Sequence, residues 1–319
     1  MSVVGYNRSV LSKKETTYGT AVVPDVDLGL IQNLTENSRN TMQRIYSLAD
    51  IDAQDIVAGT FEQNLSLEIA FQHSRILEYI IGSVTHAETT GDWVHTFAEA
   101  NSLPSMTLGL DADLSTDVVK RYAGTKTAVV ALSLALDGIL SVRADLLAKT
   151  VADSTTATAA TISTLITYPA FFATLQTGTA GTETTVTEVQ NVEVTFGTDA
   201  ARIYGLSSRL LSAQENFKRR YDFAFSAGFV NVTEYERVLG STSPNTATTP
   251  TIPSFQLDVT NGTALGSGRR RVLINIRNSV YDSFSEPTNV DGFIIADFSG
   301  FGRTLTSMVT TDNISNTAF

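Results

Sequence analysis

The chain of 319 residues contains no cysteine, one tryptophan and three histidines. The absence of cysteine excludes disulfides, thiolate metal ligands and cysteine nucleophiles. His73, His86 and His95 leave little material for a histidine-based metal site or a catalytic triad. The longest apolar runs are too short for a membrane-spanning helix, and residues 1–19 contain no stretch typical of a signal peptide. We therefore expect a protein that is made and kept on the cytosolic side, without membrane insertion.

Sequence motifs of enzymes are absent as well. The chain has no G-x-S-x-G elbow, no H-E-x-x-H pair, no Walker A loop and no G-x-G-x-x-G loop. No nucleophile, base and orienting group can be assembled from the pattern. We expect no enzymatic activity, no cofactor and no metal site.

The charge balance is acidic, with 22 basic and 33 acidic residues and a formal net charge of −11. This disfavours a dedicated nucleic-acid binder, because neutralising phosphates requires clustered Lys and Arg. A surface that must let DNA pass without holding it would instead carry this sign. The alternative explanation is ordinary solubility.

Residues 127–148 predict a long β-hairpin. Even-numbered positions from Val130 to Leu136 and from Leu140 to Leu146 are mostly large and aliphatic, whereas the odd-numbered positions between them are smaller or polar. Asp137-Gly138 separates the two runs and predicts a two-residue turn with positive φ at both residues. Each side is about ten residues, roughly 33 Å long. Such length favours a sheet that is shared between chains, with the odd-numbered, polar side exposed.

Further periodicities predict a mainly β protein with one short helix. Phe61 to Phe71 alternate as a strand with one buried side, and Ile76, Leu77, Ile80 and Ile81 form one helical face that ends at Gly82. His73, Arg75 and Glu78 are expected to lie off that face. Additional strands are predicted at residues 106–110, 189–196, 221–229, 271–281 and 292–298.

Several segments read as loops or tails. Residues 153–188 are rich in Thr, Ala and Gly, and residues 240–253 are rich in Pro, Ser and Thr. Residues 1–30 and 299–319 are polar and weakly patterned. They are either frayed termini or arms that become ordered on a neighbouring subunit.

Two basic clusters precede predicted strands. Lys218-Arg219-Arg220 comes before Tyr221, and Arg269-Arg270-Arg271 comes before Val272. Gly266-Ser267-Gly268 before the second cluster suggests an anion site, but nothing places it at a helix start, and a basic turn is the simpler interpretation. In an acidic chain, Arg219, Arg220, Arg269, Arg270 and Arg271 are candidates for contacts with acidic patches on a neighbouring subunit.

The order of several segments is similar to that of a known family. The run from Glu15 to Pro24 (ETTYGTAVVP) resembles the start of tail tube proteins of long-tailed bacterial and archaeal viruses. Residues 61–82, residues 103–108, Arg121-Tyr122-Ala123-Gly124 with the hairpin after it, and residues 189–196 continue the resemblance in order. It covers most of the first 200 residues. Residues 153–188 and those after Pro253 match nothing residue by residue.

The resemblance implies two packed antiparallel sheets, as a sandwich or barrel, with a short flanking helix in one composite domain over residues 1–319. It implies a structural protein of the virion tail, made in the host cytoplasm, that forms stacked rings, usually hexameric. One sheet of each subunit would line a channel for viral DNA, which would pass through transiently and without specific binding. Other partners would be further tail proteins: the tape measure, the tail terminator, and the baseplate or tip. Residues 153–188 would be the family's variable loop or an insertion.

Four residues are candidates for the channel lining: Glu62, Glu68, Ser133 and Asp137. The alternative for these positions is an outer solvated face. A second hypothesis for the whole protein is a β-sandwich binding module, such as a capsid decoration protein or an adhesin, whose Thr-rich loops would form the recognition surface.

Overall fold

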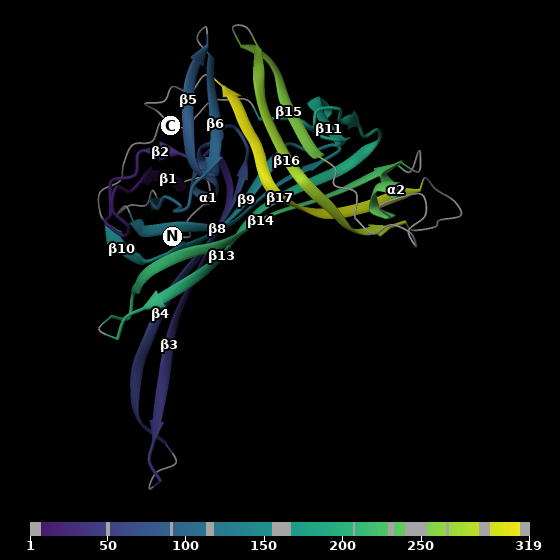
Figure 1. The fold of residues 1–319 in the computed structure, drawn as a ribbon. Helices are drawn as coiled ribbons and strands as arrows, with labels where there is room; N and C mark the ends of the chain where they lie inside the picture. Colours follow the sequence, from purple (N-terminus) through teal and green to yellow (C-terminus); the bar gives the residue numbers. More distant parts are fainter. Residues whose placement is uncertain are drawn as a thin grey trace.

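The structure is a computed structural model, and it describes residues 8–48, 52–89, 92–112, 118–154, 167–206, 208–228, 233–239, 254–265, 268–286 and 294–312. Strands dominate this part of the chain (Figure 1). It also contains helix α1 (Arg75–Ile81), helix α2 (Thr233–Leu239) and a short 3-10 turn, η2 (Ala170–Phe172). The prediction of a mainly β, antiparallel fold is confirmed.

The strands, in chain order, begin with β1 (Arg8–Lys14), β2 (Val26–Asp27), β3 (Leu30–Tyr46), β4 (Ala53–Ala70), β5 (Gly82–Thr89), β6 (Asp92–Glu99), β7 (Met106–Ala112), β8 (Val118–Ala135) and β9 (Ser141–Ala148). They continue with β10 (Thr150–Ser154), β11 (Ala173–Gly178), β12 (Thr184–Thr185), β13 (Val189–Tyr204), β14 (Leu211–Gly228), β15 (Ser254–Leu265), β16 (Gly268–Ser285) and β17 (Ile295–Asp312). β4, β8, β14, β16 and β17 have 18 residues each, about three times the usual strand length.

The long strands lie side by side in the order β3, β4, β9, β8, β13, β14, β17, β16, β15, β11. Two of them change partners along their length. The first half of β8 pairs with β7 and β10, and its second half with β9 and β13. β17 pairs first with β14 and, at its end, with β6. The seventeen described strands therefore form one connected sheet.

This sheet curls until its parts pack on each other. Phe223 in β14 and Phe255 in β15 have β17 and β16 between them in the sheet, yet their ring centroids are 4.5 Å apart. In a flat sheet, three strand spacings would separate them by roughly 14 Å. Buried residues from both parts form one core cluster. The expected two layers are thus present, but they belong to one sheet, because the long strands continue hydrogen bonding through the bend.

The predicted helix is present as α1, and Gly82 ends it with a φ of 120°. It packs against β8, β5 and β6, and all seven of its residues are buried. Arg75 and Glu78, expected off the buried face, are enclosed with charged or polar partners. Arg75 donates to the backbone carbonyl of Asp27 at 2.9 Å and forms an ion pair with the Asp27 carboxylate, and Lys14 forms an ion pair with Glu78. Ion pairing thus allows these two side chains to be buried.

The predicted hairpin is confirmed as β8 and β9, with Ser133 opposite Ser141. The turn differs from the prediction, since neither Asp137 nor Gly138 has positive φ. Residues 136–140 connect the strands instead, and segments that are distant in the sequence form hydrogen bonds with them. The N–H of Leu136 donates to the carbonyl of Gln190, and the N–H of Leu140 donates to that of Tyr168, both at 2.8 Å. A local turn is present as well, because the N–H of Gly138 donates to the carbonyl of Ala135 at 2.9 Å, but it is centred on residues 136–137 and not on Asp137-Gly138.

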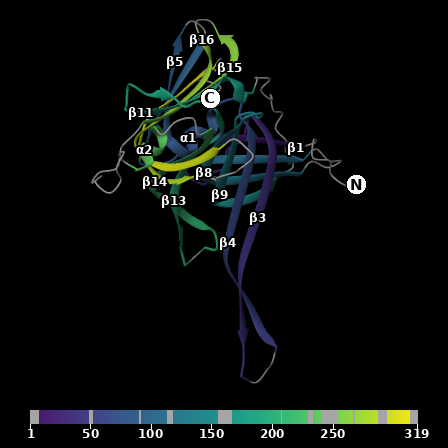
Figure 2. The ribbon, with the colours of Figure 1, turned by 90° about the vertical axis from the view of Figure 1, so that its right-hand side faces the viewer.

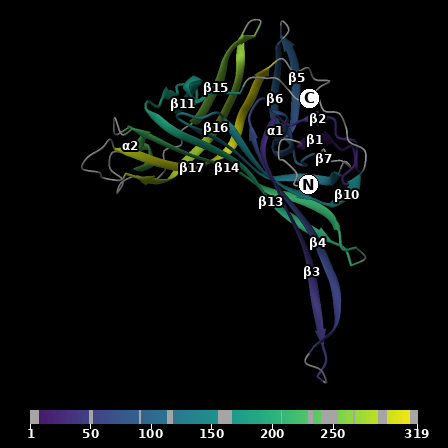
Figure 3. The ribbon, with the colours of Figure 1, turned by 180° about the vertical axis from the view of Figure 1, so that it is seen from behind.

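β3 and β4 continue beyond the rest of the sheet as a two-stranded arm, which we define as residues 40–48 and 52–60. β9 reaches β4 only as far as Gln63, so β3 is the only described strand that pairs with β4 beyond that point. Figures 1, 2 and 3 show the arm projecting from the body in every view.

The terminal segments are more ordered than expected. β1 pairs with β7, and β17 stays in the sheet as far as Asp312. The described parts of residues 1–30 and 299–319 thus contribute strands to the subunit's own sheet, and a contact of either terminus with a neighbouring subunit stays a prediction. In residues 153–188, residues 155–166 lie outside the described residues, and the later part contains η2, β11 and β12. The assignment of all 319 residues to one domain stays a prediction.

Candidate functional site

The solvent-facing side of the curved sheet carries rows of polar side chains. One row crosses neighbouring strands through Glu68, Arg143, Ala131, Thr195 and Asp222. The next row runs through Ser133, Glu193, Ala224 and Ser299. We call these two rows the polar face. Because side chains alternate along a strand, the positions between them, such as Leu132, Val194 and Phe223, are buried in the core.

Carboxylates outnumber cations on the polar face. It carries Glu68, Glu193 and Asp222 against the single guanidinium of Arg143. Glu193 and Asp222 also line a shallow depression on this side of the sheet, together with Asp282. A broad surface with one predominant sign of charge creates a potential that repels ions of the same sign. This face can therefore exclude polyanions more readily than bind them.

The structure brings two of the four predicted channel residues together. Glu68 and Ser133 lie on the polar face. Glu62 lies further along β4, towards the arm, where its carboxylate is 2.9 Å from the guanidinium of Arg202. Asp137 is exposed in the connection after β8 and is not part of the rows.

Glu193 and Asp222 were missed in the sequence. The signal was present, because Glu193 stands between Val192 and Val194, and Asp222 between Tyr221 and Phe223. These apolar neighbours identified the strands, so the alternate positions could have been assigned to the solvent-facing side.

The five candidate arginines lie in different surroundings. Arg271 donates to both carboxylate oxygens of Asp258, at 2.8 and 2.7 Å, and this hydrogen bonding raises the pKa of Arg271 above its usual value. Arg219 donates to the backbone carbonyl of Ala100, and Arg270 is buried. Arg220 is exposed. The side chain of Arg269 lies outside the described residues. Arg219 and Arg271 thus already have partners within the subunit, and a contact with a neighbour stays a prediction.

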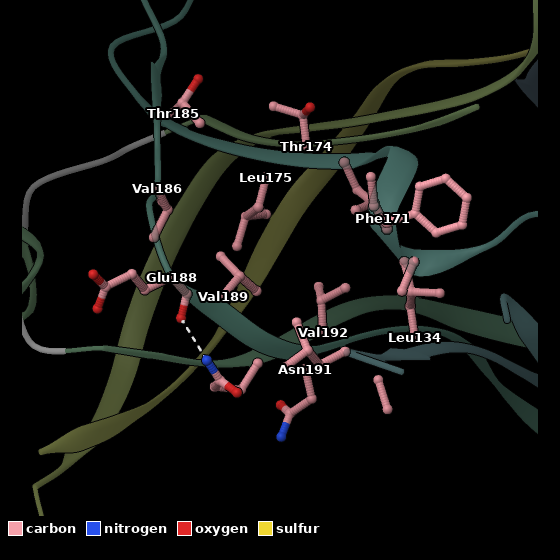
Figure 4. Close-up of a pocket in the computed structure, with 16 residues that line it drawn as sticks. Leu134, Phe171, Thr174, Leu175, Thr185, Val186, Glu188, Val189, Asn191 and Val192 are labelled. Atoms are coloured by element: carbon pink, nitrogen blue, oxygen red, sulfur yellow. Dashed lines mark hydrogen bonds between the residues drawn. The ribbon is translucent and has the colours of Figure 1, made fainter. Parts of the chain in front are cut away.

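An apolar groove of about 290 Å³ opens where β8 ends beside η2, β11 and the start of β13. Its apolar lining includes Leu134, Leu136, Phe171, Leu175, Val186, Val189, Val192 and Leu257. Figure 4 labels all of these side chains except Leu136 and Leu257 around the groove, with Glu188 at its edge. The side-chain amide of Gln190 donates to the backbone carbonyl of Glu188 at 3.4 Å. Phe171 and Leu136 are 76% and 54% exposed, so this groove presents apolar surface to solvent.

Two buried polar clusters fix strands at either end of the chain. The carboxylate of Glu15 accepts hydrogen bonds from the N–H groups of Gly19 and Gly124 and from two hydroxyls. In the second cluster, His95 lies between His86 and Asp312: its Nδ1 is 2.7 Å from His86 Nδ1, and its Nε2 is 2.9 Å from the carboxylate. Burial and the neighbouring His95 lower the pKa of His86. Both clusters join segments within the subunit.

The described residues contain no group of three or more His, Asp or Glu side chains that could hold a metal ion. No helix in the described ranges is both long and apolar enough to cross a membrane.

A family model described as "Phage tail tube protein" matches residues 5–300, which is nearly the whole chain. No curated protein matches. The matched range includes the polar face, the arm and the groove.

Proposed function

Because the chain belongs to the phage tail tube protein family, it is a structural component of the virion tail, and we propose that its copies form stacked rings around a channel for viral DNA. The polar face would line this channel, and the rings would be hexameric. In place of the original candidates Glu62 and Asp137, the proposed lining combines Glu68 and Ser133 with Glu193 and Asp222.

The polar face is the observation that carries this proposal. It extends over neighbouring strands of one continuous sheet, so a single subunit offers a broad, curved and mostly polar wall. DNA phosphates are repelled by carboxylates, and a lining with few Lys and Arg residues cannot hold the duplex by neutralising its charge. Passage would therefore be transient and independent of base sequence.

The edges of the sheet support ring formation. β3 pairs only with β4 among the described strands, so the outer side of β3 is a long edge. Exposed edges favour pairing with another chain unless something covers them. A head-to-tail contact that closes on itself converts such edges into a ring. Other tail proteins, namely a tape measure, a terminator and a baseplate or tip, would contact the ends of the stacked rings.

Electron microscopy of the purified protein tests the assembly. We expect rings or tubes with a central channel. Monomers that bind capsids or glycans would instead support the decoration or adhesin alternative.

A charge reversal tests the lining. The double variant Glu68→Lys/Glu193→Lys should still assemble, because both side chains are exposed, but virions that carry it should deliver DNA at least tenfold less efficiently. Glu88→Lys, at an exposed position in β5, is the matched control. Normal DNA delivery by the double variant would show that the polar face does not line the channel.

A further inference from the structure

We propose that His86, His95 and Asp312 form a pH-sensitive switch, which holds β5 against β6 at neutral pH and releases β5 in acid. The switch lies within one subunit, so it goes beyond the proposed function and does not depend on ring formation. It joins three strands that lie side by side: β5, β6 and the end of β17 (Figure 1).

The two histidines face each other across β5 and β6. His86 lies directly opposite His95 in the antiparallel register, and their Nδ1 atoms are 2.7 Å apart. On the other side of the His95 ring, Nε2 is 2.9 Å from the carboxylate of Asp312. His95 and Asp312 are 0% and 1% exposed, whereas His86 is only partly buried. Of the two rings, His86 is therefore the one that can turn to solvent.

The contact between the two rings can hold one proton and no more. A ring nitrogen donates when it is protonated and accepts when it is not, so one Nδ1 must carry a hydrogen and the other a lone pair. The ionised carboxylate of Asp312 only accepts, which keeps a proton on Nε2 of His95. A first added proton is tolerated, because a positive His95 can donate from Nδ1 to His86 while it stays paired with Asp312. A second one would place two N–H groups and two positive charges face to face.

The charges around His86 make this second protonation unfavourable at neutral pH. Glu78 of α1 favours a positive charge on His86 and Lys14 of β1 opposes it, but these two form an ion pair and largely cancel. The Asp312 carboxylate also favours the positive form. Burial and the neighbouring His95 outweigh it, so the pKa of His86 lies below its usual value of 6.5. We therefore expect the switch to operate below pH 6.5.

The release is expected to affect β5 and to leave β17 in place. Among the described strands, β5 pairs with β6 alone, so its other side is already an edge. The end of β17 has a second attachment that does not titrate in this range, since the hydroxyl oxygens of Ser74 and Thr310 are 2.7 Å apart and both residues are buried. Acid should thus open the β5–β6 pairing without unfolding the sheet.

The chain contains its own reporter for this movement. Trp93 is the only tryptophan. It lies in β6, two residues before His95 and on the same side of the strand, and it is opposite Glu88 of β5 and Asp312 of β17. Release of β5 should expose Trp93 to solvent and shift its fluorescence emission to longer wavelength, with a midpoint below pH 6.5. A constant emission maximum of the wild type between pH 7.5 and 5.5 would overturn the proposal.

Hydrogen–deuterium exchange, corrected for the intrinsic effect of pH, tests where the opening occurs. In the wild type, residues 83–88 should open roughly tenfold more often at pH 5.5 than at pH 7.5, whereas residues 305–310 should change little. In His86→Gln this effect should disappear, because an uncharged side-chain amide can donate to His95 or accept from it. Glu88→Gln, at an exposed position of the same strand, is the matched control and should behave like the wild type.

Three results of the exchange experiment would contradict a local switch. The first is equal opening of residues 83–88 at the two pH values in the wild type. The second is an equal pH effect in His86→Gln, since another group, such as His73, would then account for it. The third is faster exchange of residues 305–310 together with residues 83–88, which would show that acid unfolds the sheet as a whole.

Discussion

The carboxylate of Glu15 accepts a hydrogen bond from the backbone N–H of Gly124 at 2.8 Å and so joins two segments that are 109 residues apart. The same carboxylate accepts from the N–H of Gly19 at 2.9 Å. Each of its oxygens therefore receives one backbone donor. The two sequence motifs that contain Glu15 and Gly124 are therefore connected directly by hydrogen bonds to the Glu15 carboxylate.

Glu15→Gln should destabilise the subunit by about 1–3 kcal/mol, because whichever oxygen becomes an NH₂ group will face a backbone N–H that cannot turn away. Urea denaturation of the variant measures this loss. Glu88→Gln, at an exposed position, should change the midpoint little. An unchanged midpoint for Glu15→Gln would contradict this argument, because it would show that an NH₂ group facing a backbone N–H costs no stability here.

Stability should fall as the pH is lowered below about 6.5. Burial, with the neighbouring His95, lowers the pKa of His86, and burial also lowers that of His73. The folded protein consequently binds protons less readily than the unfolded chain, so acid favours unfolding. The contribution of both groups is fully present above the usual histidine pKa of 6.5. Melting temperatures at pH 7.5 and 5.5 measure the effect.

His86→Gln serves as the matched variant for this pH dependence. It should lose less stability than the wild type between pH 7.5 and 5.5. Protonation of His73 should account for part of the loss that the variant still shows. An equal loss in both proteins would exclude a role for His86.

Gly302→Ala should destabilise the fold by about 1–3 kcal/mol through overpacking. A methyl group at this position would overlap Cγ2 of Ile276, which is fully buried and cannot move aside. Gly205→Ala is the control, since a methyl group there would meet nothing within 4 Å. Equal denaturation midpoints for the two variants would contradict the packing argument.

Arg209→Ala should loosen the base of the arm without unfolding the body. The Arg209 side chain donates to the carbonyl of Gly59 at 2.8 Å and to the side chain of Asn40 at 3.0 Å. Hydrogen–deuterium exchange should become faster in residues 56–60, while the melting temperature stays within a degree or two. Unchanged exchange would mean that the backbone bond from Phe61 to the carbonyl of Arg209 is sufficient.

Much of the fold can be predicted from the sequence wherever one side of a strand is buried and the other is exposed to solvent. Val130, Leu132 and Val142 alternate in the sequence as they do in the structure, and their side chains form the core. Glu68 and Ser133 were placed on the solvent-facing side by the same alternation. β3 was not predicted, because most of its residues are exposed on both faces and no periodicity can arise.

Other features depend on partners that are distant in the sequence. Arg75 and Glu78 look like surface residues of a helix, and ion pairs with Asp27 and Lys14 help to make their burial possible. The groove combines residues 134–136, 170–175 and 185–192 with Leu257. No local pattern reports such a combination. The Asp137-Gly138 turn was wrong for the same reason, since Gln190 and Tyr168 determine the backbone there.

The changes of partner along β8 and β17 have a mechanical consequence. Each of these strands is hydrogen-bonded into two regions of the curled sheet. A slip of one residue would break the pairing in both regions at once and would turn every side chain to the wrong face. Backbone hydrogen bonds therefore fix the bend of the sheet, in addition to the packing of side chains between its two layers. The curvature is therefore preset within the single chain, and in the proposed ring it would determine the width of the channel.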